Sequence, residues 1–367
     1  MARYKLYIET DVLTEAKRRI AHIHDIFDSV VVMFSGGKDS LAVLHLVREV
    51  RQELGIPEPL DVVFRDEELI PDEVIDFVDS YRREPWVRML WFAVPLTSHK
   101  FVLGTISAYT QWDPGREWLR PRPPWALTLE PGDDRVFDQY SMDAFTAQHY
   151  RGKIAFVTGI RAAESLMRYR SSVNKLNENY ITAAASGARN VQLCKPLFDW
   201  EENDVFRYFW DRKIRYCSLY DAQLWNGDRF RVSTPLHAEA AKYFDKIRSC
   251  TPALYERLIA IFPEMLAHGR YWRDIDQDAI KRRYGHSYEG VCAWIEETIE
   301  DETELALARQ RYVAVMKRAR RSPQAYPPDY LLYRFRTGAF KREIMPLSLN
   351  EQRQRRSNQS GDLATSR

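Results

Sequence analysis

The chain has 367 residues, of which 45% are hydrophobic, and its formal net charge is +2. A chain of this length can bury a full core and add a second unit, whereas a charge so near zero gives no global positive field for indiscriminate nucleic-acid binding. Residues 1–20 lack the apolar segment of a signal peptide, and no stretch approaches the roughly 18 apolar residues of a membrane helix. We therefore expect a soluble, cytoplasmic protein with no membrane contact.

Five short apolar runs predict the strands of one sheet. The first, Val30–Phe34, is apolar without alternation, which is typical of a strand buried on both faces. The other four lie at 60–64, 87–94, 153–158 and 191–195.

Helical patterns separate these runs. They lie at 12–27, at 41–54, from Pro71 onward, and after Asp199, which we expect as an N-cap with Glu202 as its capping-box partner. Because short strands alternate with helices, the sequence predicts an α/β fold with a doubly wound parallel five-stranded sheet.

A long insertion, about 96–150, separates the third and fourth predicted strands. Its prolines, tryptophans and arginines are poor material for a regular element, and long loops in compact domains are usually binding loops or lids. Three arginines alternate there with three tryptophans: Arg116, Arg120, Arg122, Trp112, Trp118 and Trp125. These side chains either stack on bases and contact phosphates or pack the insertion against the sheet.

The remainder of the chain has a different pattern. Residues 1–235 form the expected α/β domain, and 236–345 the expected helical carboxy-terminal region. The basic stretch 317–326 fits either a nucleic-acid or partner contact, or a solvated helix end. Residues 346–367 are polar and basic, and we expect them to be disordered.

Four cysteines, Cys194, Cys217, Cys250 and Cys292, lie far apart with no Cys-x-x-Cys pair. This spacing gives neither a zinc signature nor a secreted disulfide framework. We expect reduced thiols, and we do not expect an iron–sulfur cluster.

The chain leaves the first predicted strand through the string SGGKDS, residues 35–40. Successive backbone N–H groups and the positive end of a helix dipole make such a turn a natural anion site. Lys38 adds a positive charge, and the hydroxyls of Ser35 and Ser40 can donate hydrogen bonds. Asp39 suits either the first turn of the helix or a carboxylate facing Mg²⁺. The loop is not a Walker A motif, because the first glycine and the final Ser or Thr of that motif are missing.

Two further segments follow predicted strands at the same edge of the sheet, where ligands bind in folds of this kind. After the fourth strand, Gly159 permits a tight exit, and Arg161, Ser165 and Arg168 are predicted to share one face of a helix. Arginine forks suit phosphate or sulfate oxygens, and Glu164 either orients Arg161 or takes part in metal coordination.

Three carboxylates, residues 66–68, follow the second strand. By register, Asp66 is the one that we expect to hydrogen-bond an adenosine group. The alternative is an acidic cluster that merely precedes a helix.

Four motifs carry a resemblance to a known family. SGGKDS resembles the PP-loop of ATP pyrophosphatases, which bind ATP there and cleave it between the α- and β-phosphates. Three segments resemble the phosphoadenosine phosphosulfate (PAPS) reductase family: VVFRDEELIPDEVIDFV (62–78), TGIRAAESLMRYRS (158–171) and KPLFDWEENDVFRYF (195–209). The resemblance covers roughly residues 28–235 and implies an adenine nucleotide α-hydrolase-like fold.

The resemblance also implies a site. It implies ATP, or PAPS or APS, as the bound nucleotide with Mg²⁺ held in part by Asp39, and catalytic roles for Lys38, Asp39 and Arg161. It implies that the nucleotide is bound by Ser35, Gly36, Gly37, Lys38, Asp39, Ser40, Asp66, Gly159, Ile160, Arg161, Glu164, Ser165 and Arg168.

The sequence departs from the reductases of the family. It has no carboxy-terminal Glu-Cys-Gly-(Leu/Ile)-His segment and none of the paired cysteines that hold a cluster in the APS reductases. Without an attacking thiol, release of sulfite has no visible mechanism. Members without these cysteines include the small subunit of sulfate adenylyltransferase and the ATPase of DNA phosphorothioation systems, and phage or genomic-island relatives look similar in organisation.

These departures favour nucleotide activation over reduction. We expect cleavage of ATP at the α–β phosphate, by adenylyl transfer or pyrophosphatase action, in sulfur metabolism or nucleic-acid modification. The acceptor or a partner protein would complete the reaction, and nucleic acid is a candidate partner through the insertion and the basic carboxy-terminal region. The alternatives are a PAPS or APS reductase with a non-standard thiol, and a non-catalytic nucleotide-sensing regulatory subunit.

Overall fold

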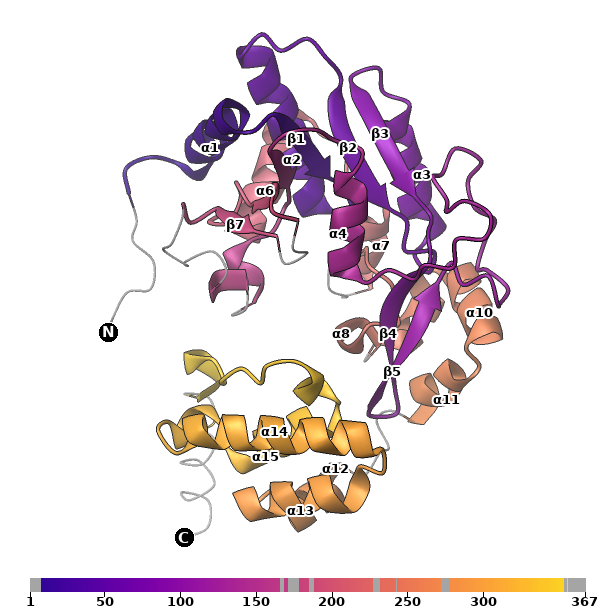
Figure 1. Ribbon diagram of the computed structural model, residues 1–367, viewed down its shortest axis with the longest axis vertical. Coiled ribbons are helices and arrows are strands. Elements are labelled where there is room, and N and C mark those ends of the chain that lie inside the picture. Colours follow the sequence, from indigo (N-terminus) through magenta and orange to yellow (C-terminus); the bar gives the residue numbers. More distant parts are fainter. Residues whose placement is uncertain are drawn as a thin grey trace. The chain divides into compact units, whose positions relative to one another are not determined.

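The computed structural model describes residues 8–165, 168–170, 178–184, 188–226, 232–241, 243–271, 277–352 and 355. The chain divides into two compact units (Figure 1), Met1–Ser98 with Ala108–Pro263, and His99–Ser107 with Glu264–Arg367. In the described part of the chain, no helix is both long enough and apolar enough to span a bilayer.

A six-stranded sheet of order β3-β2-β1-β6-β8-β7 forms the centre of the first unit. The strands are β1 (Ser29–Met33), β2 (Leu60–Arg65), β3 (Val87–Phe92), β6 (Ile154–Val157), β7 (Ile181–Ala183) and β8 (Val191–Cys194). Five of them are parallel, as predicted, and the short edge strand β7 is antiparallel to β8. Because β2 and β6 flank β1 on either side, the chain reverses its winding direction at β1, where open α/β sheets bind ligands.

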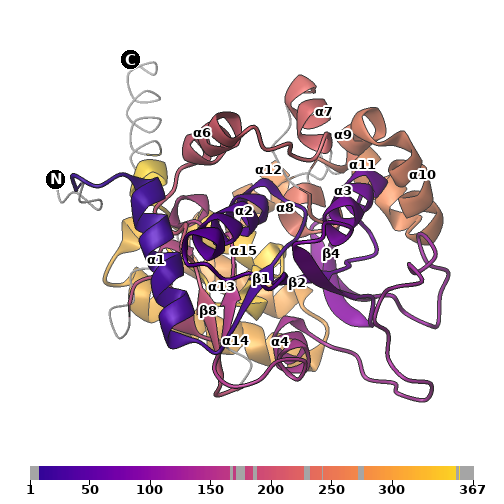
Figure 2. The same ribbon diagram turned by 90° about the horizontal axis from the view of Figure 1, so that it is seen from above.

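Both faces of the sheet are covered, which explains why the strand sequences do not alternate. Val30 and Val32 of β1 pack into one apolar cluster, and Val31 between them packs into another. The first cluster lies under four helices, α1 (Val12–Ile26), α2 (Lys38–Glu53), α3 (Asp72–Arg82) and α6 (Glu202–Arg212). The second lies under α4 (Gln139–Ala147), and Figure 2 shows these helices on opposite sides of the strands.

The insertion contains more regular structure than expected. A hairpin of β4 (Leu96–Val102) and β5 (Thr105–Gln111) precedes α4. Its two-residue turn, Leu103-Gly104, has positive φ at both positions (46° and 93°), the geometry that matches the twist of paired strands. The prediction that this segment holds no regular element was therefore wrong for its first part, which forms the hairpin, and for its last part, which forms α4.

Helix α6 begins later than predicted. Its N-cap is Glu201, and Asp204 completes the capping box. Asp199 does not cap the helix, because its carboxylate is held by two hydrogen bonds from the guanidinium of Arg19 on α1 (2.8 and 2.7 Å).

The first unit extends beyond the boundary expected at 235. It includes α7 (Leu219–Trp225), α8 (Ala238–Ala241), α9 (Phe244–Cys250) and α10 (Pro252–Ile261). Helix α10 belongs to this unit because Arg257 pairs with Asp72 of α3 (2.6 Å), and the ring of Phe262, just after α10, lies 5.4 Å from that of Tyr109 in β5.

The second unit is helical, as its sequence pattern predicts. Its helices are α11 (Glu264–Tyr271), α12 (Gln277–Tyr284), α13 (Tyr288–Thr298), α14 (Glu302–Ala319) and α15 (Pro328–Arg336), with 3₁₀ turns at Pro323–Ala325 and Ala339–Lys341. The rings of Phe335 and Phe340 stack at 5.6 Å in its core.

The chain remains structured past residue 346, where the disordered tail was expected to begin. The side chain of Ser348 accepts from the amide of Glu351 at 3.2 Å, and Arg355 pairs with Asp329 of α15 at 2.8 Å. The rest of the expected tail, residues 353–354 and 356–367, lies outside the described residues.

Candidate functional site

The 35–40 loop joins β1 to α2 and is braced by its two serines. The Ser35 amide donates to the Ser40 hydroxyl (3.2 Å), the two hydroxyls lie 3.1 Å apart, and the Ser40 hydroxyl donates to the Gly37 carbonyl (2.9 Å). These bonds tie the loop to the first turn of α2.

Gly36 is required by the close approach of α3. Its φ is +76°, and a Cβ there would lie 2.9 Å from side-chain atoms of both Val74 and Val78. Any larger residue would combine an unfavourable backbone conformation with a clash against two buried valines.

Gly159 brings the segment after β6 onto the same loop. A Cβ at this position would lie 2.6 Å from the Ser40 amide nitrogen and closer still to the Asp39 carbonyl group. Because these neighbours are backbone atoms of the first turn of α2, no side chain fits between the two segments. The structure therefore places Gly159, Ile160 and Arg161 beside the loop.

Two buried cations and two carboxylates alternate at this point. Arg161 Nε lies 2.7 Å from Asp39 Oδ1, Lys38 Nζ lies 3.1 Å from Asp39 Oδ2, and Glu202 Oε1 lies 3.2 Å from the same ammonium group. Lys38 and Arg161 are 5% and 4% exposed, so each charge depends on these partners. The sequence motifs did not include Glu202 as a site residue.

Metal binding by Asp39 does not fit this arrangement, because each of its carboxylate oxygens already faces a cation. Among the described residues no group of three or more His, Cys, Asp and Glu side chains could hold a metal ion.

The predicted helix does not include Arg161 and Ser165, although residues 168–170 are helical. Arg161 and Ser165 both have extended backbone, and only a 3₁₀ turn, Ala162–Glu164, lies between them. The Ala162 amide donates to the Phe198 carbonyl (2.7 Å), which draws the segment toward the residues after β8 instead of into a helix. Arg161 pairs with Asp39 and Arg168 with Glu164, so the arginines do not share one face. Leu166 and Met167 lie outside the described residues.

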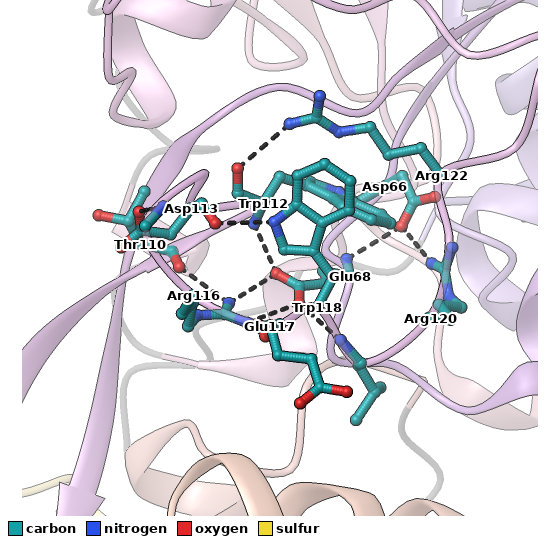
Figure 3. A network of polar contacts seen from close by, with 12 residues as sticks. Asp66, Glu68, Thr110, Trp112, Asp113, Arg116, Glu117, Trp118, Arg120 and Arg122 are labelled. Atoms are coloured by element: carbon teal, nitrogen blue, oxygen red, sulfur yellow. Dashed lines mark hydrogen bonds and ion pairs between the residues drawn. The ribbon is translucent and has the colours of Figure 1, made fainter.

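Asp66, the residue expected to contact adenosine, anchors the insertion (Figure 3). Its carboxylate accepts hydrogen bonds from the Trp91 indole and the Glu68 amide, both 2.9 Å. It also pairs with Arg120. Its carbonyl accepts from the Trp112 indole at 2.7 Å. Any contact with a nucleotide stays a prediction.

Glu68 is the centre of this network and was missed by sequence reasoning. It is 0% exposed with φ +55°, and Arg116 grips it through two hydrogen bonds of 2.8 and 2.6 Å (Figure 3). The amides of Trp112 and Leu119 also donate to it. The available signal was the run of three carboxylates followed by an arginine-rich insertion.

The alternating arginines and tryptophans are engaged within the fold. Trp112 is fully buried, and the guanidinium of Arg122 lies over the rings of Trp118 (4.2 Å) and Trp112 (5.6 Å). Trp125 is 42% exposed and carries Arg82 over its ring at 4.1 Å. The packing interpretation of the insertion thus describes most of these contacts.

A tyrosine from the later part of the unit also reaches the loop. The Lys38 amide donates to the Tyr220 hydroxyl at 2.8 Å, and a Cβ on Gly37 would lie 3.1 Å from a methyl carbon of Val232. Tyr220 lies beyond the sequence motifs, so no sequence signal identified it.

Two of the four cysteines are poorly suited to nucleophilic attack. Cys194 and Cys217 are buried, and burial raises the pKa of both thiols, that of Cys217 to about 11. A thiol with so high a pKa carries little reactive thiolate at neutral pH.

The chain is similar to known proteins over most of its first unit. Residues 29–116 and 135–258, more than half of the chain, match the family model of the phosphoadenosine phosphosulfate reductase domain. The chain is 28% identical over 236 residues to protein YbdN of Escherichia coli (strain K12), covering 60% of this chain and 57% of that protein. It is 26% identical over 205 residues to sulfate adenylyltransferase subunit 2 of Shewanella pealeana, covering 54% of this chain and 62% of the relative. The matches thus span about three fifths of each relative.

Solved structures show more distant similarity. A PAPS reductase from Candida auris in complex with phosphate aligns at 14% identity and a TM-score of 0.34, over 56% of this chain and 84% of that one. An FMN adenylyltransferase from Candida glabrata aligns at 13% identity and a TM-score of 0.39, over 59% and 62% of the two chains.

Proposed function

Because the chain belongs to the phosphoadenosine phosphosulfate reductase domain family, we propose that its 35–40 loop binds ATP or a related adenine nucleotide and cleaves it at the α–β phosphate. The products are pyrophosphate and an adenylylated acceptor, or AMP where water is the acceptor. The observation that carries the proposal is the packing of Gly159 on the Asp39–Ser40 backbone. This contact joins the anion-binding turn to the buried cation Arg161.

The proposed reaction forms no covalent bond between the protein and the nucleotide. An acceptor oxygen attacks the α-phosphorus in line, the bridging P–O bond breaks, and pyrophosphate leaves with the bonding electrons. Charge develops on the leaving oxygens, and Lys38 and Arg161 are the residues that would stabilise it. Asp39 orients both cations through its two oxygens. Mg²⁺ would arrive with the nucleotide as part of the substrate.

The proposed acceptor belongs to sulfur metabolism. Similarity to sulfate adenylyltransferase subunit 2 supports this role, which we place in the cytoplasm. The second candidate is nucleic-acid modification, and in either case a partner protein would supply the acceptor. A nucleic acid would meet exposed residues such as Trp125, since Trp112 is buried. A thiol-dependent reductase would have to use Cys250 or Cys292, because Cys194 and Cys217 are buried and their thiols have raised pKa values.

The proposal is tested by pyrophosphate release from ATP and Mg²⁺, assayed with sulfate or nucleic acid added in turn. Lys38→Ala removes the ammonium group at the loop, and we expect release to fall about 100-fold or more. Lys17→Ala is the matched control, because this lysine pairs with Glu49 and Glu53 at the opposite end of α2. Unchanged release in Lys38→Ala would refute the site. Nucleotide binding without any product would instead support a nucleotide-sensing subunit.

A further inference from the structure

The first amide of α2 already has a partner inside the protein. Gly37 is the N-cap of α2 and provides no side-chain cap. The Lys38 amide, which such a helix start leaves without an intrahelical acceptor, donates to the Tyr220 hydroxyl at 2.8 Å. Tyr220 is 3% exposed and lies on α7, Leu219–Trp225.

The same amide is one that a bound phosphate would use. Anions bind at helix amino termini through the free backbone N–H groups of the first turn. The phenol lies against the loop itself, because a Cβ on Gly37 would lie 3.4 Å from its oxygen. A phosphate oxygen cannot take the position of the phenolic oxygen while that oxygen is there.

The ammonium group of Lys38 also has partners within the protein. It lies 3.2 Å from Glu202 of α6 and 3.1 Å from Asp39. Residues from α6 and α7 thus supply acceptors for both the amide and the ammonium group of Lys38.

We propose that Tyr220 is a resident occupant of the phosphate position, and that a nucleotide phosphate oxygen replaces its hydroxyl at the Lys38 amide. The inference rests on the proposed function, because it assumes that the loop binds a nucleotide. Replacement is favoured because a charged oxygen accepts a hydrogen bond roughly twice as strong as a neutral one. Burial raises the pKa of Tyr220, so the hydroxyl it offers is neutral.

The test removes only the hydroxyl. Tyr220→Phe keeps the buried ring, and we expect the dissociation constant for the α,β-methylene analogue of ATP, measured by titration calorimetry, to fall roughly three- to tenfold, as the loss of one competing hydrogen bond implies. Tyr208→Phe is the matched control. That tyrosine is also buried, and its hydroxyl donates to Glu49 (2.6 Å), so the same change there should leave affinity unaltered.

Hydrogen–deuterium exchange provides a second measurement. In Tyr220→Phe the Lys38 amide should exchange with deuterium faster than in the wild type, and in the wild type the analogue should speed exchange in α7. If the wild type binds the analogue but Tyr220→Phe binds it equally or more weakly, the inference is overturned while the proposed function stands. If neither protein binds it, the proposed function fails and the inference fails with it.

Discussion

The Cβ position of Gly159 points into the backbone of Asp39 and Ser40. In Gly159→Ala one segment must move away from the other, because backbone atoms cannot yield as a flexible side chain does. We expect the free energy of unfolding in urea to fall by about 1–3 kcal/mol. Pyrophosphate release should fall further than this loss of stability explains, by up to about 100-fold, because the displaced group is Arg161.

Gly115→Ala is the control for that change. A Cβ at Gly115 would meet only the side chain of Asp113, at 3.2 Å in an exposed turn, so we expect stability within about 0.5 kcal/mol of the wild type. If the two substitutions lowered the free energy of unfolding equally, the close contact between Gly159 and α2 would not be the cause of the loss.

At the scale of an element, the buried carboxylate of Glu68 stabilises the folded insertion. Glu68→Gln keeps the shape but leaves the guanidinium of Arg116, 19% exposed, without its counterion. We expect the free energy of unfolding to fall by about 3–5 kcal/mol, with a change in the fluorescence of Trp112 and Trp118 as their surroundings loosen.

A control substitution and a double variant test whether the loss comes from the ion pair between Glu68 and Arg116. Glu117→Gln alters an exposed carboxylate of the same insertion and should change stability by no more than about 0.5 kcal/mol. Replacing both members of the pair, Glu68→Gln with Arg116→Met, should recover part of the loss, because no buried charge is then left alone. A double variant no more stable than Glu68→Gln would contradict the ion-pair explanation.

For the molecule as a whole, the sheet was predictable because its signal is local. Each parallel strand is an apolar run, and the turn that follows β1 carries its own chemistry in residues 35–40. The errors arose where a distant residue decides the local structure. Arg19 holds Asp199 and so moves the start of α6, and Arg161 turns to Asp39 instead of continuing a helix.

The candidate site was predictable to the same extent. The proximity of the loop to Gly159 followed from the shared sheet edge, whereas Tyr220 reaches Lys38 from far along the chain. Glu68 is similar, since its partners lie in the insertion. Pairings over such separations depend on tertiary packing, which a single sequence does not display.

The division into two units gives a prediction for the whole chain. Each unit has its own apolar cluster, so we expect two transitions in scanning calorimetry. Because the 35–40 loop belongs to the first unit, ATP should raise the temperature of only one transition, by mass action on the folded form.

A core substitution assigns the transitions. Phe335→Ala removes a ring that is 1% exposed in the second unit and should destabilise it by about 3–5 kcal/mol. It should therefore lower the transition that ATP leaves unchanged, and ATP should still raise the other. If Phe335→Ala and the addition of ATP shift the same transition, the two units unfold together. Nucleotide binding at the loop would then stabilise the helical unit as well.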